Sequence, residues 1–180
     1  MGLQSNSVTL RVEKKLAGKL GHRSVAKHIL PDEILEAIDN FHQILVEFHS
    51  PKEAEKVISG VIKTVTKLGI MFQEQSNIEN NMDCLLNMQA KLRNLFKTVQ
   101  SFHQVDYSYS RTHLFDRFDE AESSLLAVVE RLLSPKSSNR VKFVFEKLRN
   151  AEMMDEFFKV GGRFEPHREK LVFAVDMLVP

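Results

Sequence analysis

Apolar residues recur three or four positions apart along almost the whole chain, and this feature limits the possible folds most strongly. No segment alternates between apolar and polar residues for long enough to predict a β-strand. The periodicity therefore predicts an all-α bundle of six or seven helices, preceded by a basic amphipathic N-terminal helix. The expected helices cover residues 7–20, 32–48, 51–72, 80–102, 114–132, 138–149, 153–159 and 166–178.

The third of these segments has the clearest beginning. Ser50–Glu53 has the pattern of a capping box with proline in the first helical turn. Lys56, Lys63 and Lys67 share one side of this helix, where lysines usually form the solvated face. Apolar side chains occupy an arc of about 140° on the other side. They are Val57, Ile58, Val61, Ile62, Val65, Leu68 and Phe72.

Wide apolar faces of this kind allow two arrangements of a helical bundle. The helices can close directly on one another and leave no internal space, as in most close-packed protein interiors. Alternatively, the broad faces of Val, Ile, Leu, Phe and Met can line a tubular cavity. Both arrangements require the same apolar arc, so the periodicity leaves the choice between them open.

Charge is concentrated at the N-terminal end. Residues 1–30 contain six basic residues and one acidic residue, whereas the whole chain has 25 Lys and Arg against 24 Asp and Glu. We therefore predict a basic N-terminal helix with its connection over residues 1–30 and a helical bundle over residues 31–180, within one domain. Such a helix can bind an anionic membrane surface, or pack on the bundle with its charges in solvent. The near-neutral total argues against nucleic acid as a partner.

Composition also limits the cellular compartment in which the chain is expected and the chemistry that it can carry out. Cys84 is the single cysteine, which excludes a disulfide framework and a cysteine-based zinc site and favours the cytoplasm. No apolar run approaches the roughly 20 residues that span a bilayer, and no signal-peptide pattern is present. His103 and Asp106 form the best His/Asp pair, which we interpret as a contact that fixes a loop. We therefore expect no enzymatic activity, no metal and no cofactor.

Three stretches of the chain carry a more specific pattern. They are Glu13–Leu16 through Lys19 with Arg23–Ala26, Ser101–Tyr109, and Leu133–Ser137 with Arg140–Val141 and Val144–Phe145. In this order and spacing they resemble the tumour necrosis factor alpha-induced protein 8 family of lipid-binding regulators. The segment Glu53–Ile58, with Lys63 and Lys67, is similar to that family as well.

The resemblance implies a fold and a ligand that the periodicity leaves open. The family's fold is a bundle of six main antiparallel helices around a central hydrophobic cavity, after a basic N-terminal helix. The wide apolar arcs are then expected to line a lipid-sized cavity that holds a phospholipid or a fatty acid. The expected lining residues are Val61, Val65, Leu68, Phe72, Leu92, Phe96 and Val99.

The resemblance also implies a basic membrane contact near the N-terminus. Lys14, Lys15 and Lys19 match the basic positions of the family's N-terminal helix. With Arg23, they are expected to face lipid headgroups at an anionic membrane. At about 1 kcal/mol for each basic residue near such a surface, this arm would support reversible binding and not permanent anchoring.

The sequence departs from the family at two positions that bind the lipid headgroup. Two arginines that bind headgroup phosphates in the family align with Gln73 and Gln89. Glutamine can donate a hydrogen bond to a phosphate, but it has no charge and no bidentate fork. Lys91 and Arg93 lie close enough to Gln89 along the chain to replace part of the missing charge. We therefore expect weak discrimination between phosphatidylinositol bisphosphate and a singly charged phospholipid at equal surface charge.

Taken with the residues, the resemblance implies a cytosolic phospholipid-binding protein that transfers lipid and docks reversibly on the plasma membrane. Its ligands would be related to phosphoinositides, and its role would lie in apoptosis or immune signalling. An alternative is an adaptor that binds signalling proteins and whose cavity is incidental. A carrier needs an apolar cavity open beside the basic arm, whereas an adaptor needs only an exposed patch elsewhere.

Overall fold

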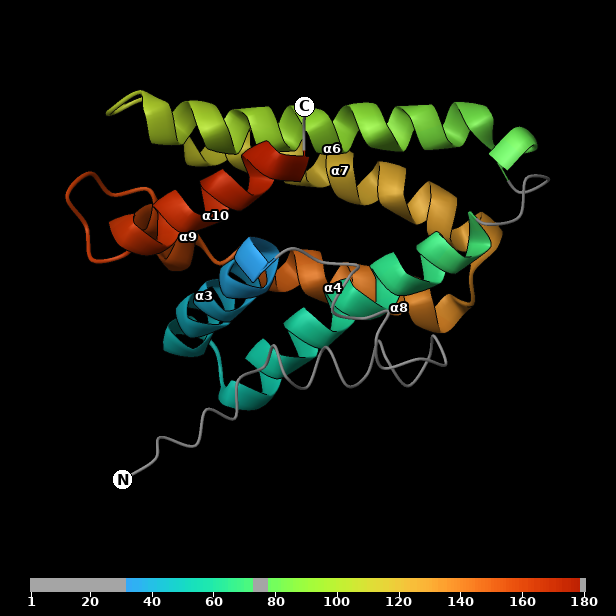
Figure 1. Cartoon of the computed structure of the whole chain (residues 1–180), viewed down its shortest axis with the longest axis horizontal. Coiled ribbons are helices and arrows are strands. Elements are labelled where there is room, and N and C mark those ends of the chain that lie inside the picture. Colours follow the sequence, from blue (N-terminus) through green and yellow to red (C-terminus); the bar gives the residue numbers. More distant parts are fainter. Residues whose placement is uncertain (1–31, 73–77, 179–180) are drawn as a thin grey trace.

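The computed structural model describes residues 32–72 and 78–178, which form seven α-helices and no β-strand within those ranges (Figure 1). The all-α fold class is thereby confirmed. The predicted helix over residues 7–20 lies outside the described residues. The helices are α3 (Asp32–Phe48), α4 (Pro51–Met71), α6 (Met82–Gln104), α7 (Arg111–Leu132), α8 (Pro135–Leu148), α9 (Ala151–Phe157) and α10 (Glu165–Leu178).

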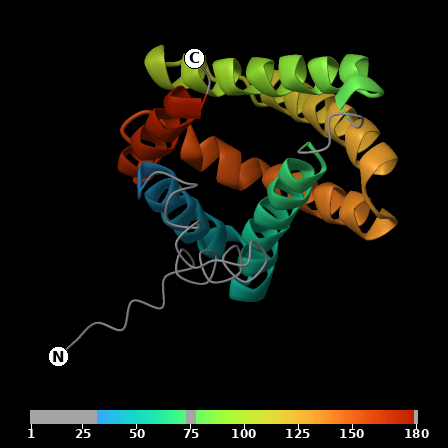
Figure 2. The same ribbon diagram turned by 45° about the vertical axis from the view of Figure 1, so that its right-hand side comes forward.

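The helices contact one another in a closed ring. α3 packs on α4, α4 on α8, α8 on α7, α7 on α6, α6 on α10, and α10 packs again on α3. The short α9 contacts both α3 and α7. In both views α6 and α7 lie along one edge of the molecule, and α3 and α4 lie on the opposite side (Figure 1, Figure 2). None of the helices in the described part of the chain is long and apolar enough to cross a membrane.

The helix boundaries agree with the periodicity to within about three residues, and one of the differences is informative. We interpreted Pro135 as the end of the fifth helix and expected the next helix to begin at Ser138. The structure ends α7 at Leu132 and begins α8 at Pro135 itself. Proline suits the first helical position because its fixed φ angle is helical and the N–H that it lacks would have no partner there.

The largest fully buried side chains include Ile44 and Leu45 of α3, Leu114 of α7 and Met153 of α9. Phe164 is also buried, although it lies in the connection between α9 and α10. Its ring centroid is 5.8 Å from that of Phe48, at the end of α3. This contact ties the α9–α10 connection to the first helix of the ring.

The predicted capping box at the start of α4 is confirmed. The Ser50 hydroxyl accepts a hydrogen bond from the Glu53 amide at 3.3 Å, and the Glu53 carboxylate accepts one from the Ser50 amide at 3.2 Å. Lys147 of α8 places its Nζ 2.8 Å from Glu53 Oε1. The hydrogen bond from Lys147, followed by those from Ser50, lowers the pKa of Glu53 from 4.5 to about 2. The cap therefore also links α4 to α8.

This shift predicts a pH dependence of stability. Because the pKa of Glu53 is lower in the folded state, the carboxylate stabilises the fold above pH 4.5, and the contribution is lost as the pH falls toward 2. The free energy of unfolding of Glu53→Gln should therefore fall less than that of the parent over this interval. Urea titrations at several pH values measure the difference. Glu130→Gln, which removes an exposed carboxylate from α7, is the matched control. Parallel pH curves for Glu53→Gln and the parent would contradict the prediction.

Candidate functional site

The face of α4 that turns toward the other helices is only partly covered. Ala54 and Val57 are 0% exposed, and Ile58 is 3% exposed. At about 100° per residue, Val61 projects between Val57 and Ala54 on the helical wheel, yet 41% of its surface is exposed. Val65 projects between Ala54 and Ile58 and is 63% exposed. Since these valines share the direction of buried neighbours, the apolar arc is uncovered at Val61 and Val65, although Leu68 farther along the same arc is buried.

Helix α6 presents an apolar face that is covered even less. Leu95 is its only buried residue along 23 positions. Leu92 and Val99 are partly buried and pack against the core. Met82 and Leu86 are 43% and 55% exposed. The neighbouring helices therefore leave much of the α6 apolar face accessible.

The seven residues predicted to line a cavity lie on α4 and α6, with Phe72 directly after α4. In the ring, α8 and α7 lie between these two helices. The role of the seven residues as a cavity wall stays a prediction. By exposure, Leu68 is buried, Phe72, Leu92, Phe96 and Val99 are half-buried, and Val61 and Val65 are exposed.

Among the predicted headgroup residues, Gln89 and Arg93 share one exposed edge of α6, because four positions complete about one helical turn. Met82 and Leu86 project toward the same edge. This edge therefore combines apolar, amide and guanidinium groups, a composition that suits the junction between an acyl chain and a polar headgroup. Five further predicted residues lie outside the described residues: Lys14, Lys15, Lys19, Arg23 and Gln73.

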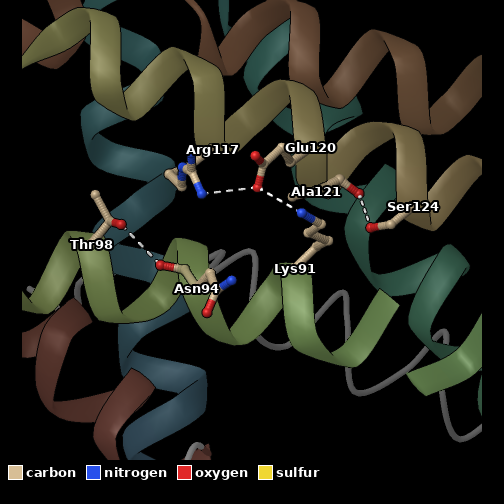
Figure 3. A network of polar contacts seen from close by, with 7 residues as sticks. All are labelled: Lys91, Asn94, Thr98, Arg117, Glu120, Ala121 and Ser124. Atoms are coloured by element: carbon tan, nitrogen blue, oxygen red, sulfur yellow. Dashed lines mark hydrogen bonds and ion pairs between the residues drawn. The ribbon is translucent and has the colours of Figure 1, made fainter. Parts of the chain in front are cut away.

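The remaining headgroup candidate, Lys91, contacts the neighbouring helix. Its Nζ lies 3.2 Å from Glu120 Oε2 on α7, and Arg117 Nη1 lies 3.0 Å from the same oxygen (Figure 3). Two cations therefore share one carboxylate between α6 and α7, and Lys91 joins the two helices. Sequence reasoning missed Glu120 because it lies 29 positions from Lys91 and no local pattern connects them.

The motif Ser101–Tyr109 has a structural explanation. The Tyr109 hydroxyl donates a hydrogen bond to Asp155 Oδ1 at 3.0 Å, and its ring stacks on Phe158 at 4.9 Å between centroids. Burial, followed by Asp155, raises the pKa of the Tyr109 phenol. His103 Nδ1 accepts a hydrogen bond from Arg168 Nε at 3.3 Å, which joins α6 to α10 in place of the loop contact that we expected.

The chain is similar to known proteins over almost its whole length. A family model described as "Tumor necrosis factor alpha-induced protein 8-like" matches residues 3–179. The chain is 31% identical over 176 residues to "Tumor necrosis factor alpha-induced protein 8" of Homo sapiens, covering 97% of this chain and 89% of that protein. It is 29% identical to "Tumor necrosis factor, alpha-induced protein 8-like protein 2 B" of Danio rerio, covering 97% and 95% of the two chains.

Proposed function

This chain belongs to the tumor necrosis factor alpha-induced protein 8-like family, and from that membership we propose that it regulates apoptosis or immune signalling by binding phospholipid. It acts in the cytoplasm, attaches reversibly to the plasma membrane through its N-terminal segment, and transfers lipid without catalysing a reaction. Its ligands include phosphoinositides, which it distinguishes only weakly from singly charged phospholipids because Gln73 and Gln89 supply no charge.

The observation that carries this proposal is the exposed part of the apolar arc of α4. Val61 and Val65 are 41% and 63% exposed although their directions on the wheel lie between those of fully buried residues. Exposing such groups to water is unfavourable, and an acyl chain that covers them gains about 0.8 kcal/mol for each buried methylene. The polar edge of α6, with Gln89 and Arg93, offers hydrogen bonds to a phosphate at the end of such a chain.

Native mass spectrometry of the purified protein tests the proposal directly. We expect a fraction of the protein to carry one phospholipid or fatty acid, identified after extraction, and the empty fraction to take up lipid from vesicles. Protein that arrives without lipid and takes none up from phosphatidylcholine or phosphatidylinositol vesicles would contradict the proposal. The family assignment would stand in that case, because it rests on the sequence.

The N-terminal segment supplies a further prediction. Changing Lys14, Lys15 and Lys19 together to Gln should lower binding to anionic liposomes and remove much of its salt dependence, because ions screen exposed charges. Sedimentation with phosphatidylserine vesicles at several salt concentrations measures both effects. The control also removes three lysine charges, by changing Lys52, Lys136 and Lys142 to Gln at exposed positions of the bundle. Equal losses in the two triple variants would show that total charge, and not this segment, determines binding.

The alternative proposal, a protein-binding adaptor, has one observation in its favour. Phe173 and Met177 are 58% and 46% exposed and lie one helical turn apart on α10. An adaptor that uses this patch would lose its cellular effect on apoptosis in Phe173→Ser and keep it in Val65→Glu. A lipid carrier would show the opposite result, so this pair of variants separates the two functions.

A further inference from the structure

A groove of about 310 Å³ lies between α6 and α7. Asn94, Lys97 and Ser101 border it from α6, and His113 and Arg117 border it from α7. Figure 3 shows Asn94 and Arg117 on the two helices that form this junction. On the helical wheel the α6 residues of the groove project nearly opposite to the apolar face of that helix. The groove is therefore separate from the proposed lipid site.

The polar side chains of this groove are mainly hydrogen-bond donors. Among the described residues, no carboxylate lines it. The side-chain groups of Asn94, Lys97, Ser101 and His113 form no hydrogen bond or ion pair within the described part of the chain; Asn94 and Ser101 accept hydrogen bonds there only through their main-chain carbonyls. An amide, an ammonium group, a hydroxyl and an imidazole are therefore available to one ligand at one place.

The charges around the groove leave a positive balance. Arg117 Nη1 lies 3.0 Å from Glu120 Oε2, and Lys91 Nζ lies 3.2 Å from the same oxygen. Two cations therefore share one carboxylate, so this group keeps a net positive charge and also fixes the position of Arg117. Lys97 adds a second positive charge from α6. The electrostatic attraction between opposite charges then favours an anion in the groove.

The His113 ring is positioned by an aromatic neighbour. Its centroid lies 6.2 Å from that of the Phe102 ring, which also lines the groove. Phe102 is itself held by edge-to-face contacts with Tyr109 and Phe158, at 5.5 Å between centroids in each case. An imidazole that packs on a fixed ring loses less freedom when a ligand binds than one on a free side chain.

We propose that the groove between α6 and α7 binds a phosphate monoester. Ammonium and guanidinium groups form strong, charge-assisted hydrogen bonds with phosphate oxygens. The donors come from two helices, so together they can reach several oxygens of a tetrahedral phosphate, whereas a carboxylate offers only two oxygens. The site does not depend on the proposed lipid function. The phosphate belongs either to a small soluble molecule or to a lipid headgroup.

Titration of the full chain with inorganic phosphate, followed by NMR of the amide groups, tests the site. In the parent, saturable shifts should include the Asn94 side-chain amide and main-chain amides of both helices. Lys97→Glu reverses one charge at an exposed position and should lower the affinity about tenfold. The control Lys142→Glu makes the same change at an exposed position of α8 outside the groove and should bind like the parent. Absence of saturable shifts in the parent, or equal losses in the two variants, would overturn the proposal.

A second variant distinguishes directed hydrogen bonds from general charge attraction. Asn94→Ala/Ser101→Ala removes two uncharged donors from exposed positions of α6, so the protein should fold with its charge unchanged. Its affinity for phosphate should fall about threefold or more, because each hydrogen bond to a charged group contributes to binding. An unchanged affinity in this variant would overturn the proposal.

The source of the phosphate is identified with two further probes. Glycerol 3-phosphate is titrated into the parent and into Lys97→Glu, and phosphatidic acid vesicles are compared with phosphatidylserine vesicles of equal surface charge. Weaker binding of Lys97→Glu to the phosphatidic acid vesicles alone supports a lipid headgroup. Unchanged vesicle binding, together with weaker binding of glycerol 3-phosphate, supports a soluble ligand.

Discussion

Replacing Val65 by glutamate should remove most of the bound phospholipid while the free energy of unfolding changes by less than about 1 kcal/mol. The side chain is 63% exposed, so a carboxylate there remains solvated in the lipid-free protein. The same carboxylate would have to be desolvated under an acyl chain, which is costly for an ion without a partner. Native mass spectrometry reports the lipid, and urea unfolding reports the stability. Val65→Trp, which acts through volume and not charge, should also lower lipid occupancy.

The same helix offers a matched control. Ile70 is 43% exposed and projects to the side of α4 opposite Val61, so Ile70→Glu adds the same charge outside the apolar arc. It should keep the lipid content of the parent. If a folded Val65→Glu protein carries as much lipid as Ile70→Glu, then Val65 does not contact the ligand.

Replacing Phe164 by alanine should have the largest effect on stability, about 3–5 kcal/mol. The ring is 2% exposed and packs against Phe48, and the Arg163 guanidinium lies 4.6 Å from its centroid. Its removal leaves a cavity where the α9–α10 connection meets α3. For a chain of this size the loss corresponds to a decrease in melting temperature of about 10 °C or more. Thermal and urea unfolding, followed by circular dichroism, measure both quantities.

Phe173→Ala is the control for this substitution. Phe173 is 58% exposed on α10, so the same chemical change there should alter stability by no more than about 0.5 kcal/mol. Similar melting temperatures for the two alanine variants would show that the connection does not depend on the Phe164 ring. The comparison also distinguishes the effect of removing a buried ring from the effect of removing any aromatic ring.

The sequence alone predicted the helices because the signals that define a helix are local. Apolar spacing of three and four residues placed all seven described helices, and Ser50 and Glu53 marked the start of α4 through contacts three positions apart. Pro135 was interpreted as the end of one helix, whereas it is the first residue of α8. A proline both follows one helix and suits the first position of the next, and only the α7–α8 geometry distinguishes the two cases.

The sequence predicted which residues lie on the apolar arc of the candidate site, but it did not predict how exposed each of them is. Periodicity placed Val61, Val65 and Leu68 on one arc, but it treats every residue of an arc alike. In the structure Leu68 is 7% exposed, whereas Val65, three positions away on the same arc, is 63% exposed. Lys91 was assigned to a headgroup from its place on α6, whereas its partner Glu120 comes from α7.

The sequence by itself determined the fold class, the start of α4, the apolar arcs and the family to which the chain belongs. The tertiary structure alone decided which parts of those arcs are covered, that Phe164 of a connection enters the core, and that Lys97 of α6 and Arg117 of α7 border one groove. The physical reason is the range of the interactions. Helix formation and capping depend on residues within about one turn, whereas burial and charge clustering depend on helices that meet only after the ring has closed.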